Sequence, residues 1–383
     1  MSLKQDISLS RRPLAGFAAI GVAWAVYFAQ MPVIKANVGA SDGAYGLAIL
    51  LAAFGALAAM WLAPACRRWA GGWAVSLGLM LLALGMFGAG WAGSLAVLTL
   101  AMLLSSVGSG IADVLVNARI SEIEDRSGRT LMNLNHALYS FAYAGGALAT
   151  GAFRSAGVGP ATVSTGLAVL LVLLAWAARD KPPVLEPEGS GTGRPAVSAL
   201  LVTLTGLVVL AAFLTEAATE GWSALHLERT LGGSPGAGAM GPALLGLTMG
   251  FGRLFGHGLS RRFREVHLML VATLISAAGV ALAGLAGTLA VALVGFAIAG
   301  LGISVVVPLA MAFVGRIVPG PARLAAISRV SVIGYGAFFF GPPLMGLIAE
   351  GFGLRAAYLA IAGLLALVAV LLIPALARRA AQA

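Results

Sequence analysis

The chain has 383 residues, of which 60% are hydrophobic and only 10% are charged, and its mean hydropathy is +0.97. Soluble proteins carry about 25% charged residues, so a water-soluble fold is excluded and the bilayer must be the solvent. The net charge of +10 does not indicate nucleic-acid binding, because nearly all charges lie in short segments between apolar runs. The single Cys66 excludes an internal disulfide and a cysteine-based metal cage.

Twelve apolar runs follow one another along the chain, each long enough to cross a bilayer, which takes about 20 residues. They cover residues 14–34, 43–64, 73–92, 94–118, 131–153, 159–178, 197–222, 239–258, 267–288, 289–314, 324–349 and 354–376. At Gly93 and at Thr288/Leu289 almost no loop separates two runs, which predicts tight hairpins outside the membrane. The sequence therefore predicts an all-α membrane protein with twelve transmembrane helices.

The basic residues indicate the orientation. With the N-terminus in the cytoplasm, 18 of the 24 Lys and Arg residues fall in cytoplasmic segments and four fall in outer segments. Positive residues concentrate on the cytoplasmic side of membrane proteins. We therefore expect a multi-pass membrane protein with both termini in the cytoplasm.

The longest polar segment, 179–196, is rich in Pro, Gly and Glu and reads as a flexible cytoplasmic linker. It divides the chain into an N-terminal six-helix bundle (1–178) and a C-terminal six-helix bundle (197–383). The stretch GSLAVLTLAMLLSSVG at 93–108 matches GTLAVALVGFAIAGLG at 287–302 in hydropathy and in its terminal glycines. Two pseudo-symmetric bundles around a central path are typical of secondary transporters.

This layout resembles the major facilitator superfamily over essentially the whole chain. GSGIADVLVNARISEIEDRSGRTLMNLNHALYSFAYAGGAL (108–148) and the segment 220–263 are similar to poorly characterised bacterial inner-membrane permeases related to the fucose permeases. The resemblance implies a protein of the bacterial inner membrane with two bundles that rock around a central site, and it does not define a substrate.

Two carboxylates lie inside the seventh run, where a charge at mid-membrane costs roughly 2.5–3.5 kcal/mol. We expect Glu216 roughly 6–9 Å below the outer end of this helix and Glu220 one turn nearer the surface on the same face. A buried carboxylate can load a proton from one side and release it to the other, which predicts proton coupling at Glu216 with Glu220 as a gate or relay. Two alternatives stay open: an ion pair of Glu216 with a neighbouring helix, and an interfacial Glu220 beside Trp222. Trp222 is itself a substrate-binding candidate.

The fourth run carries four polar side chains on one helix face: Ser106, Ser109, Asp113 and Asn117. Such a polar face must be directed towards the interior of the bundle or towards water. Asp113 is therefore a further proton-coupling candidate, and Asn117 is a substrate-binding candidate. Alternatively, Asp113 anchors an inner gate by pairing with Arg253 or Arg329, which lie near the cytoplasmic ends of their spans.

The fifth run places His136, Tyr139 and Tyr143 on one face, shortly after Asn135. Histidine titrates near neutrality, and tyrosine combines a flat apolar ring with a hydroxyl group. These four residues are candidates for binding a sugar-like or other small polar ligand. An equally open alternative is hydrogen bonding between helices, worth about 0.6 kcal/mol per contact.

The first run places Trp24, Tyr27 and Gln30 in its middle and outer half. The Gln amide favours a cavity-facing position, so these three are also substrate-binding candidates. The alternative for the aromatic residues is packing against lipid. Lys35 closes the run, and we expect it to reach the outer surface.

Together these features predict a monomeric secondary active transporter for a small polar solute, driven by proton symport through alternating access. A proton-coupled efflux antiporter for drugs or metabolites and a transporter-like receptor or lipid-handling protein remain alternatives. The sequence contains no phosphate loop, nucleophile–base arrangement or metal-ligand spacing, so we expect no enzyme and no cofactor. The expected partners are the substrate, protons and the lipid bilayer.

The orientation can be tested with the single cysteine. A membrane-impermeant thiol reagent is expected to label Cys66 in inside-out vesicles, because Cys66 precedes the basic pair Arg67 and Arg68 on the cytoplasmic side. A Cys66→Ser variant gives the background signal. Strong labelling of Cys66 in intact cells would overturn the orientation.

Overall fold

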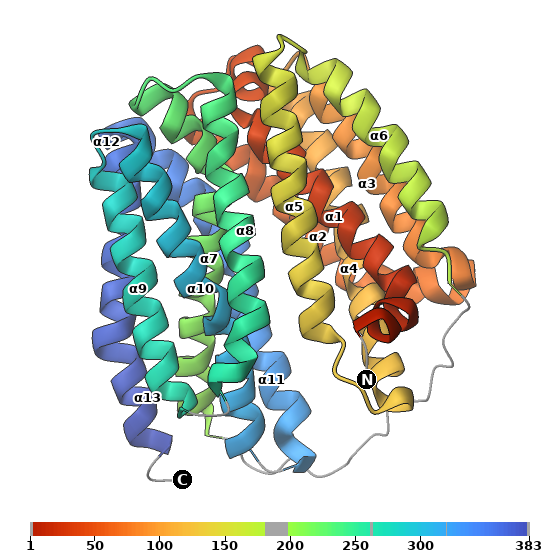
Figure 1. Ribbon diagram of the computed structural model, residues 1–383, viewed down its shortest axis with the longest axis vertical. Helices are drawn as coiled ribbons and strands as arrows, with labels where there is room; N and C mark the ends of the chain where they lie inside the picture. Colours follow the sequence, from red (N-terminus) through yellow and green to blue (C-terminus); the bar gives the residue numbers. More distant parts are fainter. Residues whose placement is uncertain (1–2, 181–197, 261–262, 319, 381–383) are drawn as a thin grey trace.

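The computed structural model describes residues 3–180, 198–260, 263–318 and 320–380 (Figure 1). The first half of the chain forms α1 (Leu3–Asn37), α2 (Asp42–Ala70), α3 (Ala74–Gly90), α4 (Leu95–Ser127), α5 (Met132–Ser155) and α6 (Pro160–Ala177). The second half forms α7 (Ala199–Leu225), α8 (Pro235–Ser260), α9 (Glu265–Leu285), α10 (Leu289–Ile317), α11 (Gly320–Tyr335), α12 (Ala337–Leu367) and α13 (Ile373–Ala380).

The all-α membrane fold is confirmed. Eight helical stretches are long and apolar enough to cross a membrane by length and composition. Two of them, Asp42–Gly90 and Ala325–Arg379, contain 49 and 55 residues, so each has the length of two spans. With α5 and α8, which have 24 and 26 residues, the described part of the chain is consistent with the twelve predicted crossings.

The predicted borders of the last two spans are partly right. Gly353, at φ 82°, interrupts α12 between the predicted spans 324–349 and 354–376. The break at Gly336, between α11 and α12, was not predicted. A single glycine inside an apolar run leaves the hydropathy unchanged, so the sequence carries no loop signal there.

Both chain ends lie at the same end of the helix bundle (Figure 1). We call this end the terminal side and the opposite end the far side. In Figure 1 the red-to-yellow helices α1–α6 and the green-to-blue helices α7–α13 lie next to each other. The two halves meet mainly where α5 packs on α8 and where α2 packs on α12, and α1 also contacts α7 and α8. Residues 181–197 lie outside the described residues, so the division at the linker stays a prediction.

The two tight hairpins predicted at Gly93 and Thr288 are confirmed. α3 ends at Gly90 and α4 begins at Leu95, while α9 ends at Leu285 and α10 begins at Leu289. Ser94 and Thr288 cap the second helix of each hairpin by accepting a hydrogen bond from the backbone N–H three residues later. The repeat noted in the sequence therefore begins at equivalent turns in both halves.

The glycine that ends each repeat lies where the two helices of the hairpin touch. A Cβ added at Gly108 would lie 2.4 Å from the backbone nitrogen of Leu82, and one added at Gly302 would lie 2.6 Å from the carbonyl oxygen of Ala272. Small residues at such positions let helix backbones approach closely, which stabilises helix pairs in lipid. The same close contact between the two helices of a hairpin therefore occurs in both repeats.

We expect Gly108→Ala and Gly302→Ala each to destabilise the purified protein by about 1–3 kcal/mol, because the added methyl group forces the paired helices apart. Thermal unfolding in detergent, followed by tryptophan fluorescence, measures the effect. Gly93→Ala and Gly287→Ala are matched controls from the same repeats, since a Cβ at either position meets nothing within 4 Å. Equal unfolding temperatures for all four variants would contradict the packing argument.

Candidate functional site

The centre of the bundle holds an ion pair between two helices of the second half. On α8, the Nη2 atom of Arg253 lies 3.3 Å from the Oε1 atom of Glu216 on α7, and both side chains keep a little exposure, 17% and 18%. The Nη1 atom of Arg253 also donates a 2.6 Å hydrogen bond to Ser140 Oγ on α5. One guanidinium group therefore links Glu216 to the first half of the chain.

Glu216 lies deeper than the sequence suggested. α7 continues to Leu225, nine residues beyond Glu216, which places Glu216 about 14 Å below the far-side end of the helix. The prediction used a helix end at residue 222 and underestimated this depth. Its alternative, an ion pair of Glu216 with a neighbouring helix, is what the structure shows.

Glu220 and two tyrosines surround this pair. Glu220 acts electrostatically on Glu216 and Arg253, and both glutamates act on Tyr139 and Tyr143 of α5. Glu220 makes no ion pair or hydrogen bond with any described residue, and the buried hydroxyl group of Tyr143 has no hydrogen-bond partner among them. A buried polar atom of this kind is usually satisfied by water or a ligand.

Asp113 and His136 belong to a second polar chain, closer to the terminal side. Asn117 donates a 3.1 Å hydrogen bond to the carboxylate of Asp113, and its Oδ1 atom lies 3.2 Å from His136 Nε2. The alternative in which Asp113 pairs with Arg253 does not occur in this conformation, because Arg253 is engaged by Glu216 and Ser140. Arg329 is exposed and forms no ion pair with any described residue.

The aromatic residues of α1 reach two other helices. Trp24 Nε1 donates a 3.0 Å hydrogen bond to Ser109 Oγ on α4, which confirms that this part of the polar stripe faces the bundle. The hydroxyl groups of Tyr27 and Tyr45 are 2.9 Å apart, and the Tyr45 ring packs edge-on against Trp222 at 5.6 Å. Trp24 and Tyr27 therefore pack against protein and not against lipid.

Three further candidates are buried. Trp222 is only 2% exposed, so it is not part of an exposed aromatic belt, and the alternative of an interfacial Glu220 beside it is wrong in this respect. The amide of Gln30 is fully buried, and neither of its polar atoms has a partner among the described residues. Asn135 donates to the Leu131 carbonyl oxygen at 2.9 Å, while its Oδ1 atom is unpartnered.

Two members of these clusters, Ser140 and Tyr45, were not predicted from the sequence. Ser140 lies four residues after His136, on the same helical face, so the periodicity of the fifth run could have indicated it. Tyr45 lies in the first turn of α2, where an interfacial tyrosine is common, and no sequence signal separates it from such a residue.

Ion pairs tie the two halves together on the far side. Arg229, just beyond α7, contacts both carboxylate oxygens of Asp42 on α2 at 2.9 and 2.5 Å. Arg154 on α5 contacts both oxygens of Glu228 at 2.6 and 3.0 Å. These bidentate pairs fix the relative position of the halves as well as their charge.

Two more contacts complete this far-side gate, defined here by Asp42, Arg229, Arg154, Glu228 and Glu350. Glu350 on α12 accepts hydrogen bonds from Ser41 Oγ at 2.8 Å and from the backbone N–H of Gly43. Lys35 forms a 2.9 Å ion pair with Asp42 and is 9% exposed, so its predicted extension to the outer surface is wrong.

The terminal side differs from the far side. Its ion pairs join Arg12 and Arg119 to Asp180, Arg119 and Arg126 to Glu122, Arg129 to Asp6, and Arg316 to Glu265. Within the described residues, none of these pairs connects α1–α6 with α7–α13. Among the described residues, ion pairs therefore connect the two halves at the far side, and the far-side gate is closed.

Comparison with known proteins identifies the family. A family model described as Major Facilitator Superfamily matches residues 205–383. A protein of Yersinia pestis, named as an uncharacterised MFS-type transporter, is 30% identical over 363 residues, which cover 93% of this chain and 92% of that protein. The chain belongs to the major facilitator superfamily. The membrane protein MosC of Rhizobium meliloti is 27% identical over 345 residues, covering 88% of this chain and 83% of its own.

Solved structures share the fold. A variant of the nucleoside transporter NupG superposes with a TM-score of 0.78 at 13% identity, covering 96% of this chain and 99% of that one. A bacterial homologue of the human lysosomal transporter Spinster gives 0.76 at 18% identity, with 99% and 98% covered. The superfamily predicted from the sequence is confirmed, and it supports membrane transport rather than enzyme activity as the function of this chain. The narrower resemblance to fucose permeases stays a prediction.

We expect Asp42→Asn to weaken the far-side gate in this member of the superfamily, because it removes the charge that holds Arg229 and Lys35. Breaking one partner out of a buried pair costs several kcal/mol, and since Arg229 is partly exposed we expect about 2 kcal/mol, a roughly 30-fold shift towards the open gate. Spin labels on Gly93→Cys and Gly287→Cys in a Cys66→Ser background report the far-side distance between the halves, since both positions are exposed.

The expected effect of pH on the far-side gate follows from the surroundings of Asp42, which lies outside the apolar run 43–64. Burial alone would raise the pKa of Asp42, but hydrogen bonds from Arg229 and Lys35 outweigh it and hold the pKa below its usual value of 3.8. A lowered pKa means that the link is present at higher pH and is lost only as the pH falls through that lowered value. The difference in far-side distance between the Asp42→Asn variant and the parent should therefore be the same at pH 8 and pH 5. A difference that vanishes at pH 5 contradicts this assignment.

Proposed function

We propose that the chain is a proton-coupled symporter that carries a small polar solute by alternating access across the bacterial inner membrane, with both termini in the cytoplasm. The contact of Arg253 with both Glu216 and Ser140 carries this proposal. It joins a titratable group to the boundary between the two halves, in the middle of the membrane-spanning helices.

The arrangement supports alternating access in the following way. The far-side gate is closed, while Glu216 and Arg253 keep a little exposure deep inside the bundle. In this proposal the centre is reached in this conformation from the terminal side, which we assign to the cytoplasm. Rocking of the halves would break the far-side pairs and form new contacts at the terminal side.

Coupling to protons would work through the partner of Arg253. Protonation of Glu216 removes the negative charge that holds the guanidinium group, so Arg253 is freed to change its contact with Ser140 on the other half. Glu220, one turn nearer the far side and without a partner in the described structure, is placed to relay the proton. Asp113, bonded to Asn117, extends the row of carboxylates towards the terminal side.

The substrate would bind between these charges and the aromatic side chains. Tyr139 and Tyr143 belong to the half opposite Glu216 and Arg253, so a solute between them contacts both bundles. Trp24, Tyr27, Trp222 and the polar groups of Gln30, Asn117, Asn135 and His136 form the surrounding wall in this proposal. Tyrosine and tryptophan faces with nearby amides suit a sugar-like or other small polar metabolite.

One observation favours an efflux antiporter as the second candidate. Among the described residues, the central ion pair and the adjoining polar chain together hold three carboxylates, Glu216, Glu220 and Asp113, against Arg253, a net charge of 1 − 3 = −2 when all are ionised. An organic cation would neutralise this excess and could lie on the aromatic faces. In an antiporter the substrate and the proton compete for the site, whereas in a symporter both are bound at the same time.

Glu216→Gln tests the coupling. The amide keeps the size of the side chain but cannot cycle a proton, so accumulation driven by a pH gradient in proteoliposomes should be abolished. Exchange of substrate at equal concentrations on both sides should persist, because it needs only the loaded carrier to rock. A thermal-stability screen of small polar solutes first supplies the substrate, since a ligand stabilises the state it binds.

Glu220→Gln is the matched comparison, with the same chemical change one turn away and no arginine partner. We expect it to slow accumulation without abolishing it. If the Glu216→Gln protein still concentrates substrate, Glu216 does not carry the proton. The direction of proton movement during substrate uptake, read with a pH-sensitive dye, separates symport from antiport.

A further inference from the structure

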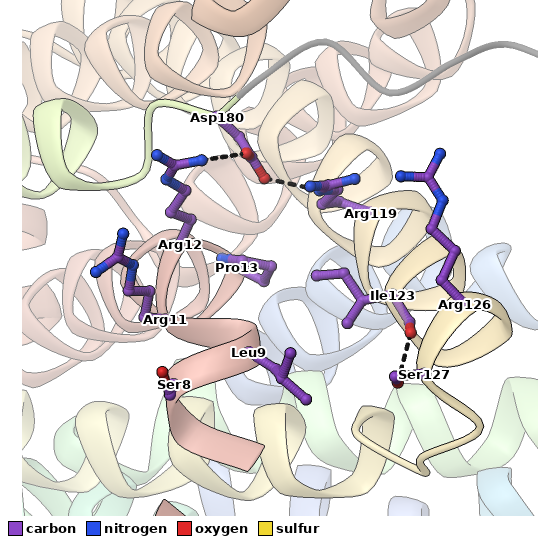
Figure 2. A pocket seen from close by; sticks show the side chains of 10 residues that line it. All are labelled: Ser8, Leu9, Arg11, Arg12, Pro13, Arg119, Ile123, Arg126, Ser127 and Asp180. Atoms are coloured by element: carbon purple, nitrogen blue, oxygen red, sulfur yellow. Dashed lines mark hydrogen bonds and ion pairs between the residues drawn. The ribbon is translucent and has the colours of Figure 1, made fainter. Parts of the chain in front are cut away.

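A cavity of about 370 Å³ opens on the terminal side between the start of α1, the end of α4 and Asp180. Four arginines line it: Arg11, Arg12, Arg119 and Arg126 (Figure 2). We call it the arginine pocket. It lies apart from the central site, and the transport mechanism proposed above does not use it.

Two of the arginines are held in place by one carboxylate. Asp180 accepts from Arg12 Nη1 and from Arg119 Nε, both at 2.7 Å, so the guanidinium groups converge from α1 and α4 as Figure 2 shows. A guanidinium group carries five N–H donors, and these ion pairs occupy only some of them. The remaining donors are pre-oriented for an oxyanion, which favours binding because little side-chain freedom is lost.

The pocket keeps an excess of positive charge. Its four arginines face two carboxylates, Asp180 and Glu122, which bonds Arg119 and Arg126, so the local sum is 4 − 2 = +2. Arg11 is exposed and forms no ion pair with any described residue. This excess of positive charge favours an anionic ligand.

The depth of the pocket corresponds to the headgroup layer of the membrane. Trp176, in the last turn of α6 just before Asp180, is 71% exposed, and Trp69 at the end of α2 is 83% exposed. Exposed tryptophans gather at the bilayer–water interface. α1 has 35 residues, about 52 Å, whereas the hydrocarbon core is about 30 Å thick, so its first turns extend beyond that core.

Much of the remaining lining is apolar. Leu9, Pro13 and Ile123 lie beside the arginines, together with the hydroxyl side chains of Ser8 and Ser127, and Leu9 is 45% exposed. A soluble phosphate compound would gain nothing from the three apolar side chains. A lipid places its phosphate against the arginines and its glycerol and first methylene groups against the apolar wall.

We propose that the arginine pocket binds the phosphate headgroup of an anionic phospholipid on the terminal side of the membrane. Basic pockets between membrane helices at this depth suit such headgroups. The bound lipid would add a further link between the start of α1 and the end of α4, which already meet through direct packing, through the Arg129–Asp6 ion pair and through Asp180.

Native mass spectrometry of the full chain, incubated with equal amounts of phosphatidylglycerol and phosphatidylcholine of identical chains, tests this proposal. The protein should retain phosphatidylglycerol preferentially. The double variant Arg11→Gln, Arg126→Gln leaves Arg12 and Arg119 on Asp180 and should lose roughly 10- to 30-fold in phosphatidylglycerol affinity, at about 1 kcal/mol per arginine. Phosphatidylcholine retention should not change.

Arg68→Gln, Arg323→Gln is the matched control, because it removes two exposed charges from the same side outside the pocket. An equal loss in the control, or unchanged retention in the pocket variant, overturns the proposal. Arg11→Lys, Arg126→Lys keeps the charge and should retain the lipid, which separates binding from misfolding.

A further measurement distinguishes a bound lipid from a bound soluble anion. Inorganic phosphate is added to protein in phosphatidylcholine, and the unfolding temperature is measured for the parent and for the Arg11→Gln, Arg126→Gln variant. We expect no pocket-dependent shift. A rise in the parent that is absent in the variant would mean that the pocket serves a free phosphate and not a lipid.

Discussion

A charge inside a bilayer has to be neutralised, and the Glu216–Arg253 contact is where this chain meets that constraint. Either group alone would cost several kcal/mol at this depth. Arg253 contacts two partners, the carboxylate of Glu216 on its own half and the hydroxyl group of Ser140 on the other. The pairing that makes the glutamate tolerable in lipid also places it at the boundary where the halves meet.

The rigidity of each half comes from another feature of membrane packing. Lipid chains are as apolar as leucine, so helices associate through close packing and not through exclusion from water. The hairpins α3–α4 and α9–α10 achieve this with glycines at which even a methyl group would clash. The contacts between halves combine the packing of α5 on α8 and of α2 on α12 with bidentate ion pairs at the far side. In the proposed rocking motion these ion pairs would break and re-form while each bundle keeps its own packing.

The fold could be predicted from the sequence because its signal is local. Runs of about 20 apolar residues, a near-loopless junction at Gly93 and its counterpart at Thr288 are each visible within one segment. The site could be predicted only as faces of separate helices. That Arg253 bonds Glu216 and Ser140, or that Asp42 bonds Arg229 at a separation of 187 residues, depends on how distant helices pack. The interfacial alternative at Trp222 and the predicted extension of Lys35 to the surface were wrong for the same reason, since a helix end looks alike in sequence whether it faces water or a partner.

The two glutamates of α7 can now be considered as a unit. Within the described residues, Glu216 forms an ion pair with Arg253, and Glu220, a single turn away, has no such partner. If both carboxylates are ionised, the three groups sum to 1 − 2 = −1, which is costly in a low dielectric. In the proposed mechanism a proton or a cationic solute would supply the missing positive charge. The spacing of Glu216 and Glu220 would then make the neutrality of the centre depend on what is bound there.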